Sequence, residues 1–228
     1  MKTHDTPEKS YDLERLIFFS DGVFAIAITL LVIEMHPPAN WDGTLTSLAV
    51  ALAPNVLYYA ISFSAIGAFW MSHRLIFRYV QMFRETVAWL NLLFLLLIGL
   101  MPLATAVLQE GQKNTHALSL AAIEVYVGLI CALSVIVGIV WGYVSLIAKV
   151  VDPRVTAHFK WITLIRLAVI PPIMCSASLW FGTRFGLAPA LVFVAACAFL
   201  SGRIHSSPFG KAPLAEQAAP PEETPPIT

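Results

Sequence analysis

An acidic side chain lies within an otherwise apolar segment near the N-terminus, where residues 15–29 have the sequence RLIFFSDGVFAIAIT. A charged residue in a bilayer costs about 2.5–3.5 kcal/mol on insertion scales, so Asp21 needs a polar partner or water. Ser20 precedes it directly, and Arg15 lies six residues before it. These residue types predict a polar site near one end of a membrane-spanning helix.

Partners for this site are expected from two later segments. Trp70 and His73 are three residues apart and share a helix face, and either ring can donate a hydrogen bond to a carboxylate. Asn91 lies in the apolar run VAWLNLLFLLL, where its amide needs a partner. All three lie at a predicted depth similar to that of Asp21. The alternative is that Trp70 is an interfacial aromatic anchor and His73 part of the positive band at the membrane surface.

The face of the first helix opposite Asp21 carries a narrow stripe. At 100° per residue, five positions fall within about 40° of Arg15: Phe19, Gly22, Ile26, Thr29 and Ile33. One interpretation is ordinary helix packing, with the Thr29 hydroxyl bonded to its own backbone. The other is a pore-lining face, in which symmetry-related copies form apolar constrictions at Ile26 and Ile33. A ring of Thr29 hydroxyls between them would replace water around a passing cation.

The elements that position these residues are expected to be membrane helices. The 228 residues are 58% hydrophobic and 12% charged, with mean hydropathy +0.75, whereas soluble domains carry about 25% charged residues. The sequence predicts an all-α polytopic membrane protein, because a span needs about 20 apolar residues and six segments qualify. They are residues 14–35, 45–72, 86–108, 118–148, 158–181 and 186–203. Pro102 and the pair Pro171–Pro172 predict kinks or breaks in the third and fifth spans.

The distribution of basic residues predicts the orientation. If the N-terminus is cytoplasmic, 11 of the 14 Lys and Arg residues lie inside, whereas Lys113 and Arg184 lie outside and Arg166 lies within the fifth span. By the positive-inside rule, both termini are cytoplasmic. Residues 1–205 form one membrane domain, and the proline-rich residues 206–228 are predicted to be a disordered cytoplasmic tail. The formal net charge of zero argues against a nucleic-acid partner.

Other functional classes are less well supported. The six histidines form no HxxxH or HExxH pair, and no nucleophile–base constellation is present, so an enzyme and a cofactor are not expected. The three cysteines lie in apolar runs without metal-site spacing, so no structural metal is expected. A proton-coupled secondary transporter that uses Asp21 and His73 is the main alternative to a channel. Transporters usually have repeated halves around a midplane site, and the chain has no second copy of the first-helix pattern.

The first helix resembles the signature of the endolysosomal potassium channels and their prokaryotic relatives. The resemblance rests on Arg15-x-x-x-Phe19-Ser20-Asp21 followed by GVFAIAITLLV. It extends to Phe69-Trp70-x-x-His73, to Asn91, and to the run LMPLAT at residues 100–105. Specific motifs therefore cover about the first half of the chain.

The resemblance implies a potassium-permeable or weakly cation-selective channel without a reentrant loop filter, in a prokaryotic cytoplasmic membrane. It implies a homotetramer of six-helix subunits, with the first helix of each lining the pore. Ile26 then matches the gate, Thr29 the layer tied to potassium preference, and Ile33 a further apolar ring. The resemblance also assigns seven residues to a polar network that joins the first three helices: Arg15, Phe19, Ser20, Asp21, Trp70, His73 and Asn91.

Overall fold

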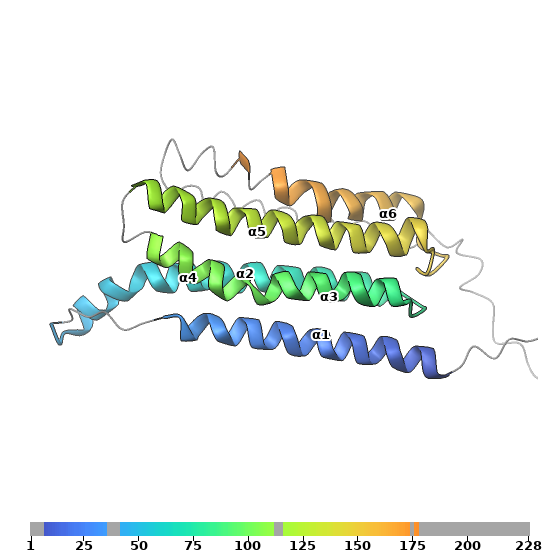
Figure 1. Cartoon of the computed structure of the whole chain (residues 1–228), viewed down its shortest axis with the longest axis horizontal. Helices are drawn as coiled ribbons and strands as arrows, with labels where there is room; N and C mark the ends of the chain where they lie inside the picture. Colours follow the sequence, from blue (N-terminus) through green and yellow to red (C-terminus); the bar gives the residue numbers. More distant parts are fainter. Residues whose placement is uncertain (1–6, 36–41, 112–115, 174–175, 178–228) are drawn as a thin grey trace, which may run out of the picture.

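The computed structural model of the chain is a set of long helices lying side by side (Figure 1). It describes residues 7–35, 42–111, 116–173 and 176–177. The elements are α1 (Pro7–Ile33), α2 (Leu45–Tyr79), α3 (Glu85–Gly99), α4 (Met101–Gly111), α5 (His116–Gly142), the π-helix η1 (Tyr143–Ile147), α6 (Ala157–Leu164) and the π-helix η2 (Ile165–Val169). An all-α architecture is therefore confirmed.

Within the described residues, four helical stretches are long and apolar enough to cross a membrane: Tyr11–Ile33, Leu45–Tyr79, Glu85–Gly111 and Leu120–Ile147. They coincide with the first four predicted spans. The fifth predicted span begins as α6 and η2, and part of it lies beyond the described residues. The predicted span at 186–203 and the predicted tail at 206–228 lie outside the described residues altogether.

Two helices are longer than the sequence predicts. Helix α1 begins at Pro7 rather than near residue 14, and proline is well suited to the first helical position because its missing N–H has no partner there. Helix α2 continues to Tyr79 rather than ending near residue 72. Its last turns still bury His73, Ile76 and Phe77 against the other helices, so the polar residues in this stretch do not end the helix.

The proline predictions correspond to two local distortions. The third span is interrupted at Leu100, between α3 and α4. Pro102 explains the interruption, because it has no N–H to donate and its ring collides with the carbonyl four residues earlier. In the fifth span, the π-helix η2 ends at Val169, two residues before Pro171, and the chain remains helical through Pro172 to residue 173. The second distortion is thus a widened turn rather than a break.

The helices pack around a buried apolar core. Helix α1 packs on α2, α3 and α4, whereas α5 packs on α3, α4 and the α6–η2 segment. Helices α5 and η2 approach each other closely at Gly138, where an added Cβ would collide with Ala168. Glycine at this position therefore lets the two backbones touch, as small residues commonly do between membrane helices.

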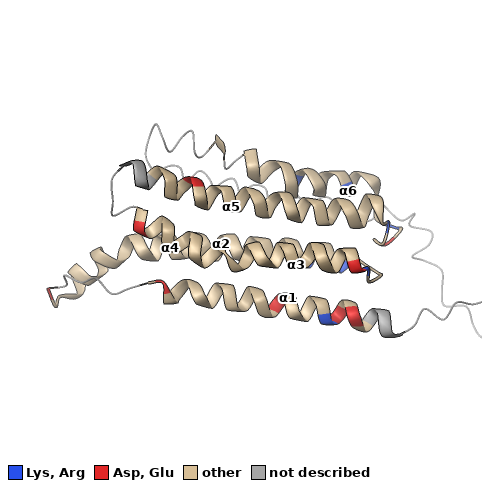
Figure 2. Ribbon diagram, viewed as in Figure 1, with Lys and Arg blue, Asp and Glu red and all other residues tan. Residues whose placement is uncertain are grey.

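Most charged residues lie toward the ends of the bundle, and a few lie within the helices (Figure 2). At the end where α1 begins, the segment after α2 and the segment after η1 join through a Val80–Val151 bridge and a hydrogen bond from Gln81 N to Val150 O of 2.9 Å. In the same region, the Arg154 side chain binds Asp152 at 2.8 Å. Hydrogen bonds from Arg154 hold the pKa of the Asp152 carboxyl below its ordinary value.

Candidate functional site

Helix α1 has two faces with opposite environments. The inner face is buried, and Ser20 and Leu31 are each 0% exposed. The predicted stripe lies on the other face, where Ile26 is 61% and Ile33 is 66% exposed, and Thr29 is also exposed. The stripe therefore contacts little of the described chain, and its apolar side chains are available to another surface.

On the inner face, three polar side chains join α1, α2 and α3. Asn91 Nδ2 donates to Ser20 Oγ at 2.9 Å, and Asn91 Oδ1 lies 3.0 Å from His73 Nε2. Ser20 Oγ donates to the Leu16 carbonyl at 2.7 Å. All three side chains are at least 99% buried. Asn91 is thus the central member, since it contacts one partner on each neighbouring helix.

The donor and acceptor roles in these hydrogen bonds fix the tautomer of His73. The Asn91 amide group donates to Ser20, so its carbonyl oxygen faces His73 and accepts from Nε2–H. The imidazole ring packs among aromatic rings, with centroid distances of 4.4 Å to Phe77, 5.7 Å to Phe24 and 6.1 Å to Phe94. His73 Nδ1 is buried without a hydrogen-bond partner among the described residues. An uncharged imidazole fits this apolar surrounding.

Asp21, the residue after Ser20, has a different hydrogen-bond partner. Trp70 Nε1 donates to Asp21 Oδ1 at 2.8 Å, and the Arg74 guanidinium lies over the Trp70 ring, 4.8 Å from its centroid. Asp21 and Trp70 are half-buried. The carboxylate is therefore satisfied by a neutral donor that is itself close to a cation, in keeping with the cost of an unpaired charge.

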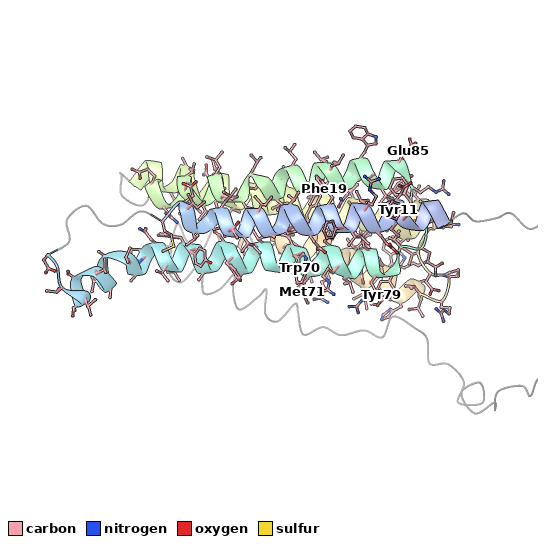
Figure 3. The ribbon with its side chains drawn as sticks, turned by 90° about the horizontal axis from the view of Figure 1, so that it is seen from below. Tyr11, Phe19, Trp70, Met71, Tyr79 and Glu85 are labelled. Carbon is pink, nitrogen blue, oxygen red and sulfur yellow. The ribbon has the colours of Figure 1, made fainter. Side chains whose placement is uncertain are left out.

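The structure brings together five of the seven residues predicted for the network, in the two sets just described. The other two, Arg15 and Phe19, lie on the exposed side of α1. The Arg15 guanidinium lies over the Tyr11 ring, 5.7 Å from its centroid, and Phe19 is 53% exposed. Figure 3 labels Tyr11 and Phe19 on α1 and Trp70 on the neighbouring α2.

The same side of α1 is open along the half of the stripe nearer the start of the helix. The residues that line this open surface all belong to α1 and include Arg15, Phe19, Gly22 and Ile26. In the other half of the stripe, Thr29 and Ile33 are also exposed. The stripe is thus accessible along its length rather than covered by another part of the described chain.

A second buried polar cluster was not predicted. Thr105 Oγ1 lies 2.8 Å from Ser62 Oγ, and Ser62 Oγ lies 3.1 Å from the Tyr126 hydroxyl. The cluster joins α2, α4 and α5 more than two turns from His73. Thr105 is the single hydroxyl residue in the run LMPLATAVL, and Ser62 lies in an apolar run that also contains Ser64. Isolated hydroxyl residues in apolar runs are the signal that could have suggested partners for each other. Among the described residues, no group of three or more His, Cys, Asp or Glu could hold a metal ion.

Comparisons with known proteins place these features in one family. Residues 15–102 match the family described as the endosomal/lysosomal potassium channel TMEM175. A protein of Streptomyces collinus named a potassium channel is 36% identical over 156 residues, which cover 68% of this chain and 75% of that protein. The mouse protein named endosomal/lysosomal proton channel TMEM175 is 31% identical over 128 residues, which cover 50% of this chain and 26% of that protein.

A solved structure has the same fold. It is the crystal structure of a lysosomal potassium-selective channel TMEM175 homolog from Chamaesiphon minutus, with a TM-score of 0.59 and 28% sequence identity. The superposition covers 82% of this chain and 98% of that one. The matched family segment contains the stripe of α1 together with Trp70, His73 and Asn91.

Proposed function

The chain belongs to the TMEM175 family, and from this premise we propose that it is a potassium channel of a prokaryotic cell membrane. Four copies assemble around an axis, with α1 of each copy lining the pore. The observation that carries the proposal is the exposed stripe on α1, which leaves Ile26 and Ile33 61% and 66% exposed in the single chain. One subunit alone cannot enclose a water path, so the stripe needs symmetry-related copies to face.

The stripe supplies the layers of the pore. Rings of Ile26 and Ile33 form apolar constrictions that limit conductance by excluding water. Between them, Thr29 Oγ1 donates its proton to the Ile26 carbonyl at 2.9 Å, which leaves the lone pairs of the hydroxyl oxygen available to a cation. A ring of these oxygens would replace part of the hydration shell of K⁺, which binds transiently and is not a structural metal.

The inner face of α1 holds this stripe in place. Ser20 is bound by Asn91 and Asp21 by Trp70, so α1 is tied to both α2 and α3 near the middle of its Tyr11–Ile33 span. These ties fix the rotation of α1 about its axis and hence which residues face the pore. We assign the end of the bundle with Arg78, Arg84 and Lys149 to the cytoplasm, because basic residues favour that side.

The vertebrate relatives are named proton channels, and a proton-coupled transporter remains the functional alternative. A relay through Asp21 and His73 would need the two side chains to exchange a proton. Each instead binds its own partner, Trp70 in one case and Asn91 in the other. This arrangement favours a structural role for both residues.

Single-channel recording of the purified protein in a planar bilayer tests the proposal, with potassium on one side, sodium on the other and equal pH. We expect unitary steps with a reversal potential that favours potassium. A second recording under a pH gradient with symmetrical potassium measures proton current. Absence of unitary steps, together with saturable proton-driven ion uptake into liposomes, would replace the channel with the transporter.

A further inference from the structure

The helices that flank α1 carry two outward-facing rows of opposite character. The first row, here called the ridge, lies on α3 and α4 at spacings of four and three residues, and its members are large and exposed: Trp89, Leu93, Leu96, Leu100 and Leu103. The second row, here called the shallow face, lies on α2 at the same spacing and consists mostly of small residues: Ala60, Ser64, Gly67 and Met71. A Cβ added at Gly67 meets no atom within 4 Å.

These rows lie on opposite flanks of the subunit. Helix α1 packs on both α2 and α3, and Figure 3 shows α2 on one side of α1 with α3 and α4 on the other. The ridge is on the side of α3 opposite the buried Asn91, and the shallow face is on the side of α2 opposite the buried Ser62. A pair of different patches on opposite flanks is the arrangement that closes a ring by heterologous contacts.

Heights along the helices show which residues of the two rows would meet. Rotation about an axis parallel to the helices keeps every residue at its height, so a residue in one copy meets residues of equal height in the next. Within one chain, α2 runs antiparallel to α3 and α4, and the Asn91–His73 contact of 3.0 Å marks one shared height. Leu93 lies two residues after Asn91 on α3, and Met71 lies two residues before His73 on α2. Leu93 is therefore level with Met71.

The second buried cluster gives the same relation near the other end of the rows. Thr105 and Ser62 are 2.8 Å apart and therefore share a height. Leu103 lies two residues before Thr105 on α4, and Ser64 lies two residues after Ser62 on α2. Leu103 is therefore level with Ser64. Leu103 of the ridge is thus level with the small Ser64 of the shallow face, whereas Leu93 is level with the larger Met71. Small residues allow close approach between membrane helices.

Charges at the cytoplasmic end agree with this alignment. Glu85 lies six residues before Asn91, and Arg78 lies five residues after His73, so the two are level within about one 1.5 Å helical step. Both are exposed, and Glu85 continues the line of the ridge whereas Arg78 continues the line of the shallow face. Opposite charges therefore end the two rows at the same height.

We propose that the ridge of one copy packs against the shallow face of α2 in the next copy, and that four such contacts close the ring. This inference rests on the proposed tetrameric channel and specifies its subunit interface. The partner is a second copy of this chain, in which Glu85 faces Arg78 of the neighbour. Lipid covering both rows is the competing outcome.

Disulfide cross-linking tests the contact in native membranes. In a background with Cys131, Cys175 and Cys197 changed to serine, the pair Leu103→Cys/Ser64→Cys is oxidised and separated on a non-reducing gel. We expect dimers, trimers and tetramers from the double variant and monomers from each single variant. Co-expression of the two single variants should give only a dimer that contains one of each chain.

The matched control is Leu103→Cys/Gly128→Cys. Tyr126 shares the height of Ser62 through their 3.1 Å contact, and α5 runs parallel to α2, so Gly128 is level with Ser64. Gly128 is also exposed, but it lies on α5, which Figure 1 places on the far side of the bundle from α1. This pair should remain monomeric, and equal cross-linking in both pairs would mean random collision and overturn the interface.

The mass of the unoxidised protein, measured by light scattering after detergent extraction, separates the two proposals. A tetramer that gives no cross-link with Leu103→Cys/Ser64→Cys overturns the interface and leaves the proposed channel intact. A monomer overturns both. If the first double variant fails to fold, Leu93→Cys/Met71→Cys gives the same test one helix turn or more closer to the cytoplasm, with the same expected ladder.

Discussion

The two faces of α1 use opposite chemistry in the same membrane span. The inner face combines the fully buried Phe24 and Leu31 with Ser20, whose hydroxyl is bonded on both sides. The outer face places Ile26 and Ile33 in the open, with a single hydroxyl layer between them at Thr29. One face therefore has its polar groups satisfied within the chain, whereas the other has apolar groups that contact little of the described chain.

We therefore expect the inner face of α1 to determine the stability of the subunit and the outer face to determine conduction. Substitutions on the inner face remove contacts within one subunit, so they should change unfolding. Substitutions on the stripe remove few such contacts, so in the proposed channel they should change ion flow while the subunit remains folded. Unfolding and ion flow should therefore respond to different substitutions.

The largest loss of stability is expected for Asn91→Leu. The change removes the bonds to Ser20 and His73 and leaves the buried His73 Nε2–H without an acceptor. Hydrogen bonds between membrane helices contribute about 0.6 kcal/mol on average and at most about 1.7 kcal/mol, so two should cost about 1–3 kcal/mol. Unfolding by SDS titration in mixed micelles measures this cost.

The control for that variant is Leu92→Ala, which truncates the adjacent exposed residue on α3. It should unfold at nearly the same SDS fraction as the unmodified protein, because Leu92 is not part of the buried core. Equal midpoints for Asn91→Leu and the unmodified protein would show that the inner face does not depend on its polar bonds.

On the stripe, Ile26→Asn should raise unitary conductance several-fold without moving the unfolding midpoint. The amide side chain wets an apolar constriction and removes the barrier that dewetting imposes. Ala25→Asn is the matched control, since Ala25 is also exposed and lies one residue away, off the stripe. Bilayer recordings that show the same conductance for Ile26→Asn and Ala25→Asn would remove Ile26 from the constriction.

A smaller effect is expected for Thr29→Ala, which should lower the potassium-to-sodium permeability ratio. The change removes the hydroxyl oxygen, and a difference of about 1 kcal/mol between the two ions corresponds to about a five-fold change in the ratio. Thr29→Ser keeps the hydroxyl and should keep the ratio. Reversal potentials under potassium–sodium gradients measure both variants, and an unchanged ratio in Thr29→Ala would place selectivity elsewhere.

The sequence predicted the two faces of α1 because the 3.6-residue period of a helix is enough to assign each residue to one face or the other. It also predicted that Asn91 needs a partner, since an amide in an apolar run has few alternatives. It did not predict that Arg15 and Phe19 lie apart from the bonded residues, because a motif records neighbours in sequence rather than contacts. The Ser62–Thr105–Tyr126 cluster depends on the angle between helices after the Pro102 interruption, which local sequence does not determine.

The smallest effect is expected for Trp70→Phe, which removes the donor to Asp21 and keeps an aromatic ring under Arg74. Both Asp21 and Trp70 are half-buried, so water can replace the lost donor. We therefore expect a cost of about 0.5–1.5 kcal/mol, below that of Asn91→Leu. SDS titration of Trp70→Phe, Asp21→Ala and the double variant gives the coupling between the two side chains. A coupling near zero would mean that the motif aspartate is stabilised by solvent, and the Ser20–Asn91–His73 bonds alone would then fix the rotation of α1.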